Sequence, residues 1–163
     1  DPTDILAALE RAQDAFERVG RGRAAFEDGI DADADWKTQL TKACRLLEVV
    51  DVLRSQDGYY TAVIEVCFGA IERSIEAYAL AMTNDTLEDF QDHEFSYDRA
   101  HEIGLFEPET AAEMQELYSD NRTESYYGGR RPTEEQTAAM AELATAVHQF
   151  TVAQTREGGV CLC

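Results

Sequence analysis

The stretch YYTAVIEVCFGAIERSIEAYAL, residues 59–80, carries the strongest fold signal in the sequence. Its apolar residues recur every three or four positions, which is the spacing of one face of an α-helix. These residues are Ala62, Val63, Val66, Cys67, Ala70, Ile71, Ile75 and Tyr78. The segment is also the most apolar of the helical segments in the chain. We therefore predict a helix that begins near Tyr59 and lies at the centre of the fold.

Two further helices are predicted on the N-terminal side of this segment. The first has apolar residues at helical spacing, namely Ile5, Leu6, Leu9, Ala12, Phe16 and Val19. It is expected to stop at Gly20 and Gly22, because glycine is a frequent helix terminator. The second runs from about Asp35 to Arg54 and ends before the break at residues 56–58.

The C-terminal side contains shorter elements and then one more long helix. Residues 84–96 form a polar connection in which D-T-L-E, residues 85–88, is expected to start a short capped helix. A short turn is expected over residues 97–103. Pro108 then opens a helix that runs toward Arg122. The pattern T-x-x-Q at residues 133–136 follows a proline and is a capping box for the last helix.

These segments predict an all-α protein, an up-down bundle of four long helices plus short extra helices. No segment alternates apolar and polar residues as a strand does. The length of 163 residues is most simply one domain. We expect that domain to cover residues 1–157 and residues 158–163 to form a flexible C-terminal tail.

The amino-acid composition is strongly acidic. Asp and Glu total 33 against 14 Lys and Arg, a formal net charge of −19, and Lys37 and Lys42 are the two lysines. Acidic residues spread over every segment resemble the composition of haloarchaeal proteins. At about 1 M salt the Debye length is near 3 Å, so this charge does not exclude an RNA ligand. No apolar run approaches the length of a membrane span. We expect a cytoplasmic protein without a membrane partner.

The sequence holds none of the common motifs for phosphate loops, dinucleotides or metals. It has no G-x-x-x-x-G-K-[ST], G-x-G-x-x-G, H-E-x-x-H or E-x-x-H. Its three histidines, His93, His101 and His148, are far apart and lack the spacing of metal ligands. We expect no bound metal and no cofactor.

The stretch NRTESYYGGRR, residues 121–131, is the strongest candidate for a binding site. Arg122, Tyr126 and Tyr127 would share a helix face, and Arg130 and Arg131 complete the densest basic cluster of the chain. We predict that these five residues bind a phosphate or a nucleotide. Two alternatives stay open, since Arg122 could pair with a nearby carboxylate and the tyrosines could be interface aromatics.

The order of these segments resembles the HEPN family of small helical bundles. One subgroup of that family ends a helix with R-x-x-A-D-Y-G. Arg122, Tyr127 and Gly128 match this pattern, whereas Ser125 and Tyr126 replace its alanine and aspartate. Residues 59–80 are also similar to the family's A-x-x-x-x-Y-x-A-x-x-x-x-x-A-L helix, with Phe68 at the aromatic position.

The resemblance implies a catalytic role for Arg122 and Tyr127, but one residue of the family's catalytic motif is absent here. Active family members are metal-independent RNases that use R-x(4–6)-H at the cleft of a homodimer. Here the positions four to seven beyond Arg122 hold Tyr126, Tyr127, Gly128 and Gly129, so the motif histidine is absent. Other members pair with a minimal nucleotidyltransferase that attaches AMP to a tyrosine. Tyr127 occupies a comparable position and would be the AMP acceptor.

We therefore expect a homodimeric RNA- or nucleotide-binding component of a toxin–antitoxin or defence-type system, with nuclease activity reduced or lost. One alternative is an active metal-independent RNase that uses Arg122 with a partner other than the motif histidine. Another is a structural dimerisation module without a ligand. The sequence leaves open whether the acidic residues Glu65, Glu72 and Glu76 of the central helix face the cleft.

Overall fold

The structure is a computed structural model that describes residues 2–17, 25–123 and 128–155. The described part contains six α-helices and one 3-10 helix and no strand, which confirms the predicted all-α class. The elements are α1 (Pro2–Glu17), α2 (Asp35–Gln56), α3 (Tyr60–Met82), η1 (Leu87–Phe90), α4 (His93–Glu102), α5 (Pro108–Asp120) and α6 (Glu134–Thr155). The predicted tail, residues 158–163, lies outside the described residues.

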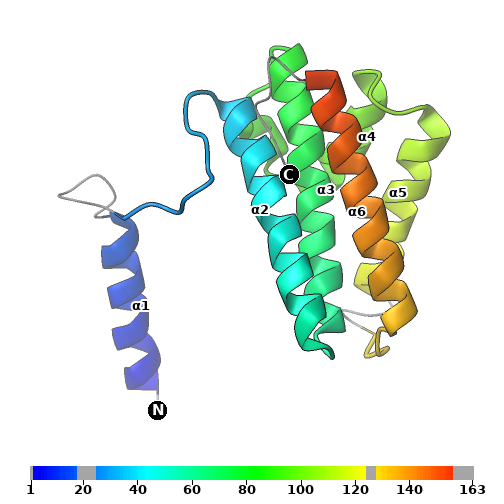
Figure 1. Ribbon diagram of the computed structural model, residues 1–163. Helices are drawn as coiled ribbons and strands as arrows, with labels where there is room; N and C mark the ends of the chain where they lie inside the picture. Colours follow the sequence, from blue (N-terminus) through cyan, green and yellow to red (C-terminus); the bar gives the residue numbers. More distant parts are fainter. Residues whose placement is uncertain (1, 18–24, 124–127, 156–163) are drawn as a thin grey trace.

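Helix α3 lies at the centre of the bundle, as its apolar sequence predicts. It packs along α2 on one side and along α6 on another, and α4 covers part of the remaining surface (Figure 1). Twelve of its 23 residues are buried, and the side chains of Ile71 and Ile75 are at most 1% exposed. A helix that is buried on several faces needs apolar residues all round, and the sequence of α3 meets that requirement.

Helix α5 is held mainly by α4 rather than by the central helix. The turn between α4 and α5 is closed by two backbone bonds, because the N–H groups of Leu105 and Phe106 both donate to the carbonyl of Ala100. Leu105 is buried beneath this turn. The last helix, α6, returns between α2 and α5 and packs on α3 (Figure 1).

Helix α1 stands apart from the bundle formed by α2 to α6 (Figure 1). Its apolar stripe is exposed, with Ile5 at 70%, Leu9 at 51% and Phe16 at 82% of their accessible surface. The predicted stop at Gly20 and Gly22 lies outside the described residues. Among the described residues, no helix combines the length and apolar character that crossing a bilayer requires.

The connection between α3 and α5 differs from the prediction in two respects. The short helix starts at Leu87, and its capping box is formed by Thr86 and Asp89 rather than within residues 85–88. The predicted turn at residues 97–103 is a longer helix, α4, which begins at His93. The cause is Asp92, whose carboxylate accepts a hydrogen bond of 3.0 Å from the N–H of Glu94 and so caps the helix ahead of the polar H-E pair.

The start of α6 confirms the predicted capping box. The Thr133 N–H donates to the side chain of Gln136 at 2.9 Å, and the Gln136 N–H donates to the Thr133 hydroxyl at 3.1 Å. Further along, α6 is tied to α3 by a buried contact of 3.0 Å between Ser74 Oγ and His148 Nδ1. His148 is 1% exposed, and burial lowers its pKa from 6.5 to about 4.

We expect His148 to make the stability of the fold depend on pH. Between pH 6.5 and about 4 the unfolded chain protonates this histidine while the folded chain keeps it neutral. Its contribution to stability is therefore complete above pH 6.5 and is lost as the pH falls toward 4. Relative to His148→Gln, the wild type should lose about 3 kcal/mol more unfolding free energy between pH 7 and 4. Urea unfolding at both pH values measures this difference.

The matched control is His101→Gln, because His101 is exposed on α4. This variant should keep the pH dependence of the wild type. Parallel stability curves for the wild type and His148→Gln would contradict the assignment.

Candidate functional site

The C-terminal end of α5 places Arg122 at the edge of the bundle. After Asp120 the helix widens into a π-type turn over residues 121–123, a distortion that often marks functional sites. Arg122 is half-buried there. It follows Tyr118 by one helical turn, and its guanidinium carbon lies 5.4 Å from the centre of the Tyr118 ring. This is a cation–π distance, so the ring fixes the position of the guanidinium group.

Tyr118 is the meeting point of four other side chains, and Glu72 is bonded to one of them, His93; we call this group of six the Tyr118 cluster. Its members are Phe68, Glu72, His93, Tyr97, Tyr118 and Arg122. The Tyr118 ring centre lies 5.4 Å from that of Phe68, 5.5 Å from that of Tyr97 and 6.4 Å from that of His93. Helices α3, α4 and α5 each contribute to the cluster. The structure thus places a histidine beside the same tyrosine ring as Arg122, although none occupies the motif positions just after Arg122 in the sequence.

His93 is held by a buried carboxylate. Its Nδ1–H donates to Glu72 Oε2 at 3.0 Å, which leaves Nε2 able to accept a proton or to hydrogen-bond a ligand. The Glu72 side chain is 4% exposed, whereas that of His93 is 57% exposed. A ligand in solvent can therefore reach the histidine but not the carboxylate that orients it.

Burial dominates the electrostatics of the cluster. It raises the pKa of Glu72 above 4.5, and the hydrogen bond and positive charge of His93 oppose this shift. Burial and the charge of Glu72 raise the pKa of Tyr118, while the charge of Arg122 lowers it. Tyr97 is 1% exposed, and burial followed by the charge of Glu72 raises its pKa as well. Both phenols therefore stay protonated at neutral pH, and neither is a general base.

A second carboxylate on α3 has a structural role. Glu76 lies one turn beyond Glu72, is 2% exposed, and accepts hydrogen bonds from Gln39 at 2.6 Å and from Arg73 at 2.7 Å. It joins α2 to α3. Glu65, the third acidic residue of this stripe, is half-buried near Tyr118. The sequence leaves open which way these acidic side chains point. The structure places Glu72 in the cluster and Glu76 against α2.

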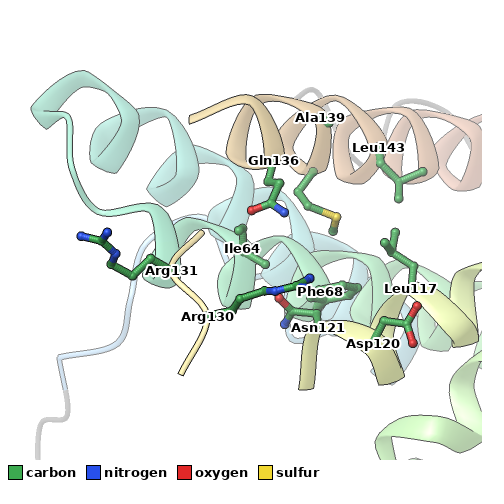
Figure 2. Close-up of a pocket in the computed structure, with 11 residues that line it drawn as sticks. Ile64, Phe68, Leu117, Asp120, Asn121, Arg130, Arg131, Gln136, Ala139 and Leu143 are labelled. Atoms are coloured by element: carbon green, nitrogen blue, oxygen red, sulfur yellow. The ribbon is translucent and has the colours of Figure 1, made fainter. Parts of the chain in front are cut away.

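The arginines predicted to form one basic cluster take part in two different features. Arg122 lies over Tyr118, whereas Arg130 and Arg131 line a pocket of about 310 Å³ between α5 and α6. Figure 2 shows the Arg130 side chain reaching toward Asn121 and Phe68, while Arg131 points away from the other lining side chains. The floor and walls of this pocket are mostly apolar and come from Ile64, Phe68, Leu117, Ala139, Met140 and Leu143.

Tyr126 and Tyr127 lie outside the described residues. Their predicted roles in phosphate binding, and that of Tyr127 as AMP acceptor, stay predictions. The sequence does not predict His93 at this site, because the family motif places its histidine just beyond Arg122 in the chain. His93 belongs to a polar connection, and its spacing from Arg122 matches no motif. The sequence D-H-E, residues 92–94, does indicate a helix that begins at His93, because Asp92 is a typical helix cap.

The described residues contain no group of three or more His, Cys, Asp or Glu side chains arranged to hold a metal ion. The chemistry that the Tyr118 cluster offers to a ligand is a cation held by an aromatic ring and an exposed imidazole, because both phenols are buried. Such groups suit the oxygen atoms of a phosphate.

A family model described as Domain of unknown function (DUF8154) matches residues 1–163, so the chain belongs to that family. No curated protein and no solved structure matches the chain. The resemblance to the HEPN family stays a prediction.

We expect Glu72 to lower the stability of the fold as the pH rises. Above pH 4.5 the unfolded chain releases the proton of this carboxyl group, while the folded chain holds it more tightly because its pKa is raised. The unfolding free energy should therefore fall through this window. Glu72→Gln removes the ionisation, so its stability relative to the wild type should increase between pH 4 and 8.

Chemical denaturation at several pH values between these limits measures the effect. Glu88→Gln is the control, because Glu88 is exposed in η1 and should give a constant difference from the wild type. The prediction fails if the difference for Glu72→Gln does not change with pH.

Proposed function

We propose that this member of the family binds the phosphate groups of RNA or of a nucleotide at the Tyr118 cluster, with Arg122 as the principal contact. The observation that supports this proposal is that Arg122 and His93 both lie beside the ring of Tyr118, with His93 oriented by a buried carboxylate. The resemblance to the HEPN family adds the biological context. The protein would act as a homodimer in the cytoplasm of a salt-rich cell, in a toxin–antitoxin or defence-type system.

The geometry around Arg122 suits ligand binding. An exposed arginine spends conformational entropy when it contacts a ligand, whereas the Tyr118 ring already holds this guanidinium group. Arginine is also suited to bidentate contact with phosphate oxygens. The exposed His93 ring supplies a second donor when protonated, and its orientation is fixed by Glu72.

The acidic residues near the cluster repel an anionic ligand, but salt screening limits this repulsion. Glu65 and Glu94 lie close enough to raise the pKa of Tyr118. In molar salt the Debye length is about 3 Å, so these exposed or half-exposed charges act weakly beyond direct contact. Glu72 is buried beneath His93, and its hydrogen bond to that ring keeps it out of contact with a ligand in solvent. Arg122 and His93 are then the groups that a phosphate would contact.

A second candidate function is RNA cleavage, and His93 is the observation that favours it. With Nδ1 bonded to Glu72, Nε2 could take the proton of an RNA 2′-hydroxyl as its oxygen attacks the adjacent phosphorus. Arg122 would stabilise the negative charge on the phosphoryl oxygens. The imidazolium would return the proton to the departing 5′-oxygen, leaving a 2′,3′-cyclic phosphate. This scheme replaces the absent motif histidine with one from α4.

AMP attachment and nucleotide binding involve residues beyond the cluster. As implied by the resemblance, a minimal nucleotidyltransferase would modify Tyr127, and Tyr126, Arg130 and Arg131 would help to hold the phosphates. Arg130 already reaches toward Asn121, which is adjacent to Arg122 in the chain (Figure 2). Incubation with ATP and the partner enzyme, followed by mass measurement of the tryptic peptide, tests this part of the proposal.

We expect Arg122→Ala to weaken RNA binding by about 10- to 100-fold, the loss of one charge-assisted contact. Fluorescence anisotropy of a labelled single-stranded oligoribonucleotide, titrated at several KCl concentrations from 0.5 to 2 M, measures the affinity. The control is Arg45→Ala, since Arg45 pairs with Glu27 and Glu48 on the surface of α2. Equal affinity of the wild type and Arg122→Ala, with both folded, would leave Arg122 a packing residue in a structural module.

We expect His93→Gln to separate binding from cleavage. If the site cleaves RNA, this variant should lose 100-fold or more of the rate, the typical range for a general base, while its affinity changes little. Electrophoresis of labelled RNA after incubation in about 2 M KCl detects the products and their cyclic ends. His101→Gln is the control from the same helix. Intact RNA with the wild type would exclude cleavage and leave binding as the function.

A further inference from the structure

Two apolar surfaces in the structure lack a packing partner. The first is the stripe on α1, formed by Ile5, Leu6, Leu9 and Phe16, all of them more than half exposed. The second is the groove between α5 and α6 that contains the pocket of about 310 Å³. Exposed apolar surfaces of this kind usually mark interaction sites.

The groove has the form of a helix-binding site. Its floor is α3, through Ile64 and Phe68, and its walls are α5 and α6, through Leu117 and Leu143. Since α5 packs mainly on α4, and α6 on α3 and α2, the two walls are not closed on each other. Beyond the pocket, Phe150 of α6 stacks on Phe106, which precedes α5, with ring centres 6.2 Å apart. Grooves with such walls accept the apolar face of an amphipathic helix.

The pocket in this groove is long enough for part of α1. Along α6 its lining extends from Gln136 to Leu143, which is about 11 Å at 1.5 Å per residue. Helix α1 has 16 residues and is about 24 Å long by the same measure, so about two of its turns would fill the pocket. Ile5, Leu9 and Phe16 are four and seven residues apart, the spacing of anchors that face one groove.

The charges of the two surfaces are complementary. Helix α1 carries Asp4, Glu10, Asp14 and Glu17 against Arg11, a net charge of −3. The charged residues that line the pocket are Arg130, Arg131 and Asp120, a net charge of +1 within a chain whose net charge is −19. An acidic helix is therefore better matched to this groove than to the acidic remainder of the surface.

We propose that α1 of one copy of the chain lies in the α5–α6 groove of a second copy, and that the exchange of two such helices forms a symmetric dimer. In the structure α1 stands on the α2 side, away from α5 and α6 of its own bundle (Figure 1). A second copy brings a free groove to it, and two-fold symmetry then buries both apolar stripes and both grooves. This inference names the contact of the homodimer in the proposed function, and it does not use the phosphate contacts of Arg122 and His93.

The test is the mass of the full chain in 1–2 M KCl, measured by light scattering after size-exclusion chromatography. The wild type should have twice the monomer mass of 18.2 kDa. Leu9→Glu in α1 and Leu117→Glu in the groove should each give monomers. Val52→Glu should remain a dimer, because Val52 is 62% exposed on α2 and outside both surfaces. Circular dichroism confirms that each variant is folded.

Mixing the two monomeric variants tests whether the contact joins α1 to the groove. The Leu9→Glu chain keeps an intact groove, and the Leu117→Glu chain keeps an intact α1. An exchange dimer can therefore form one of its two contacts, so the mixture should recover dimer mass at higher concentration, while each variant alone stays monomeric.

Three results would overturn the proposal. A monomeric wild type would mean that α1 docks within its own chain or not at all. A dimer that survives Leu9→Glu would place the interface elsewhere. A dimer that survives Leu117→Glu but not Leu9→Glu would mean that two copies of α1 pair with each other. RNA affinity, measured separately, does not enter these outcomes.

Discussion

Burial of two carboxylates on the central helix is the constraint on which the neighbouring helices depend. Glu72 and Glu76 are one turn apart on α3 and are at most 3% exposed. A carboxylate removed from water is costly unless polar groups replace its hydration. Gln39 of α2 and Arg73 supply them for Glu76, and His93 of α4 supplies one for Glu72. Helix α2 and the start of α4 are therefore positioned by polar contacts as well as by apolar packing.

The same constraint explains why α4 begins where it does. Arg99 donates two hydrogen bonds, of 2.7 and 2.9 Å, to Asp85 in the preceding connection, which holds α4 against the end of α3. Asp92 caps the helix directly before His93. The cap fixes the backbone at the point where the imidazole must meet Glu72. A local capping residue and a long-range ion pair thus place the exposed histidine of the candidate site.

The sequence predicts the helices of the bundle well because the spacing of apolar residues records which face is buried. Residues 59–80 predict α3 to within about one residue at its start, and T-x-x-Q predicts the start of α6. The start of α4 is missed because a polar segment has no such spacing.

The candidate site is predicted in part. Arg122 is identified by its place beside aromatic residues, whereas His93 reaches it through tertiary packing across α3, α4 and α5, which local spacing does not encode. The sequence groups Arg122 with Arg130 and Arg131; in the structure Arg122 lies over Tyr118, while Arg130 and Arg131 line the pocket between α5 and α6.

The two unpartnered surfaces follow from the way α5 is held. A helix that packed fully on α3 and α6 would fill the space between them, and the walls at Leu117 and Leu143 would meet. Here α5 is fixed at its N-terminal end by the turn onto Ala100, and at its C-terminal end by the contacts of Tyr118 with α3 and α4. Both attachments draw α5 toward α4 and leave the side next to α6 open. The aromatic contacts that assemble the Tyr118 cluster are thus also the reason for the groove. Leu117, which lines the groove, directly precedes Tyr118 in α5, and Phe68 belongs to both the groove and the cluster. A ligand at Arg122 and a helix at Leu117 would then influence each other through the position of α5 and through Phe68.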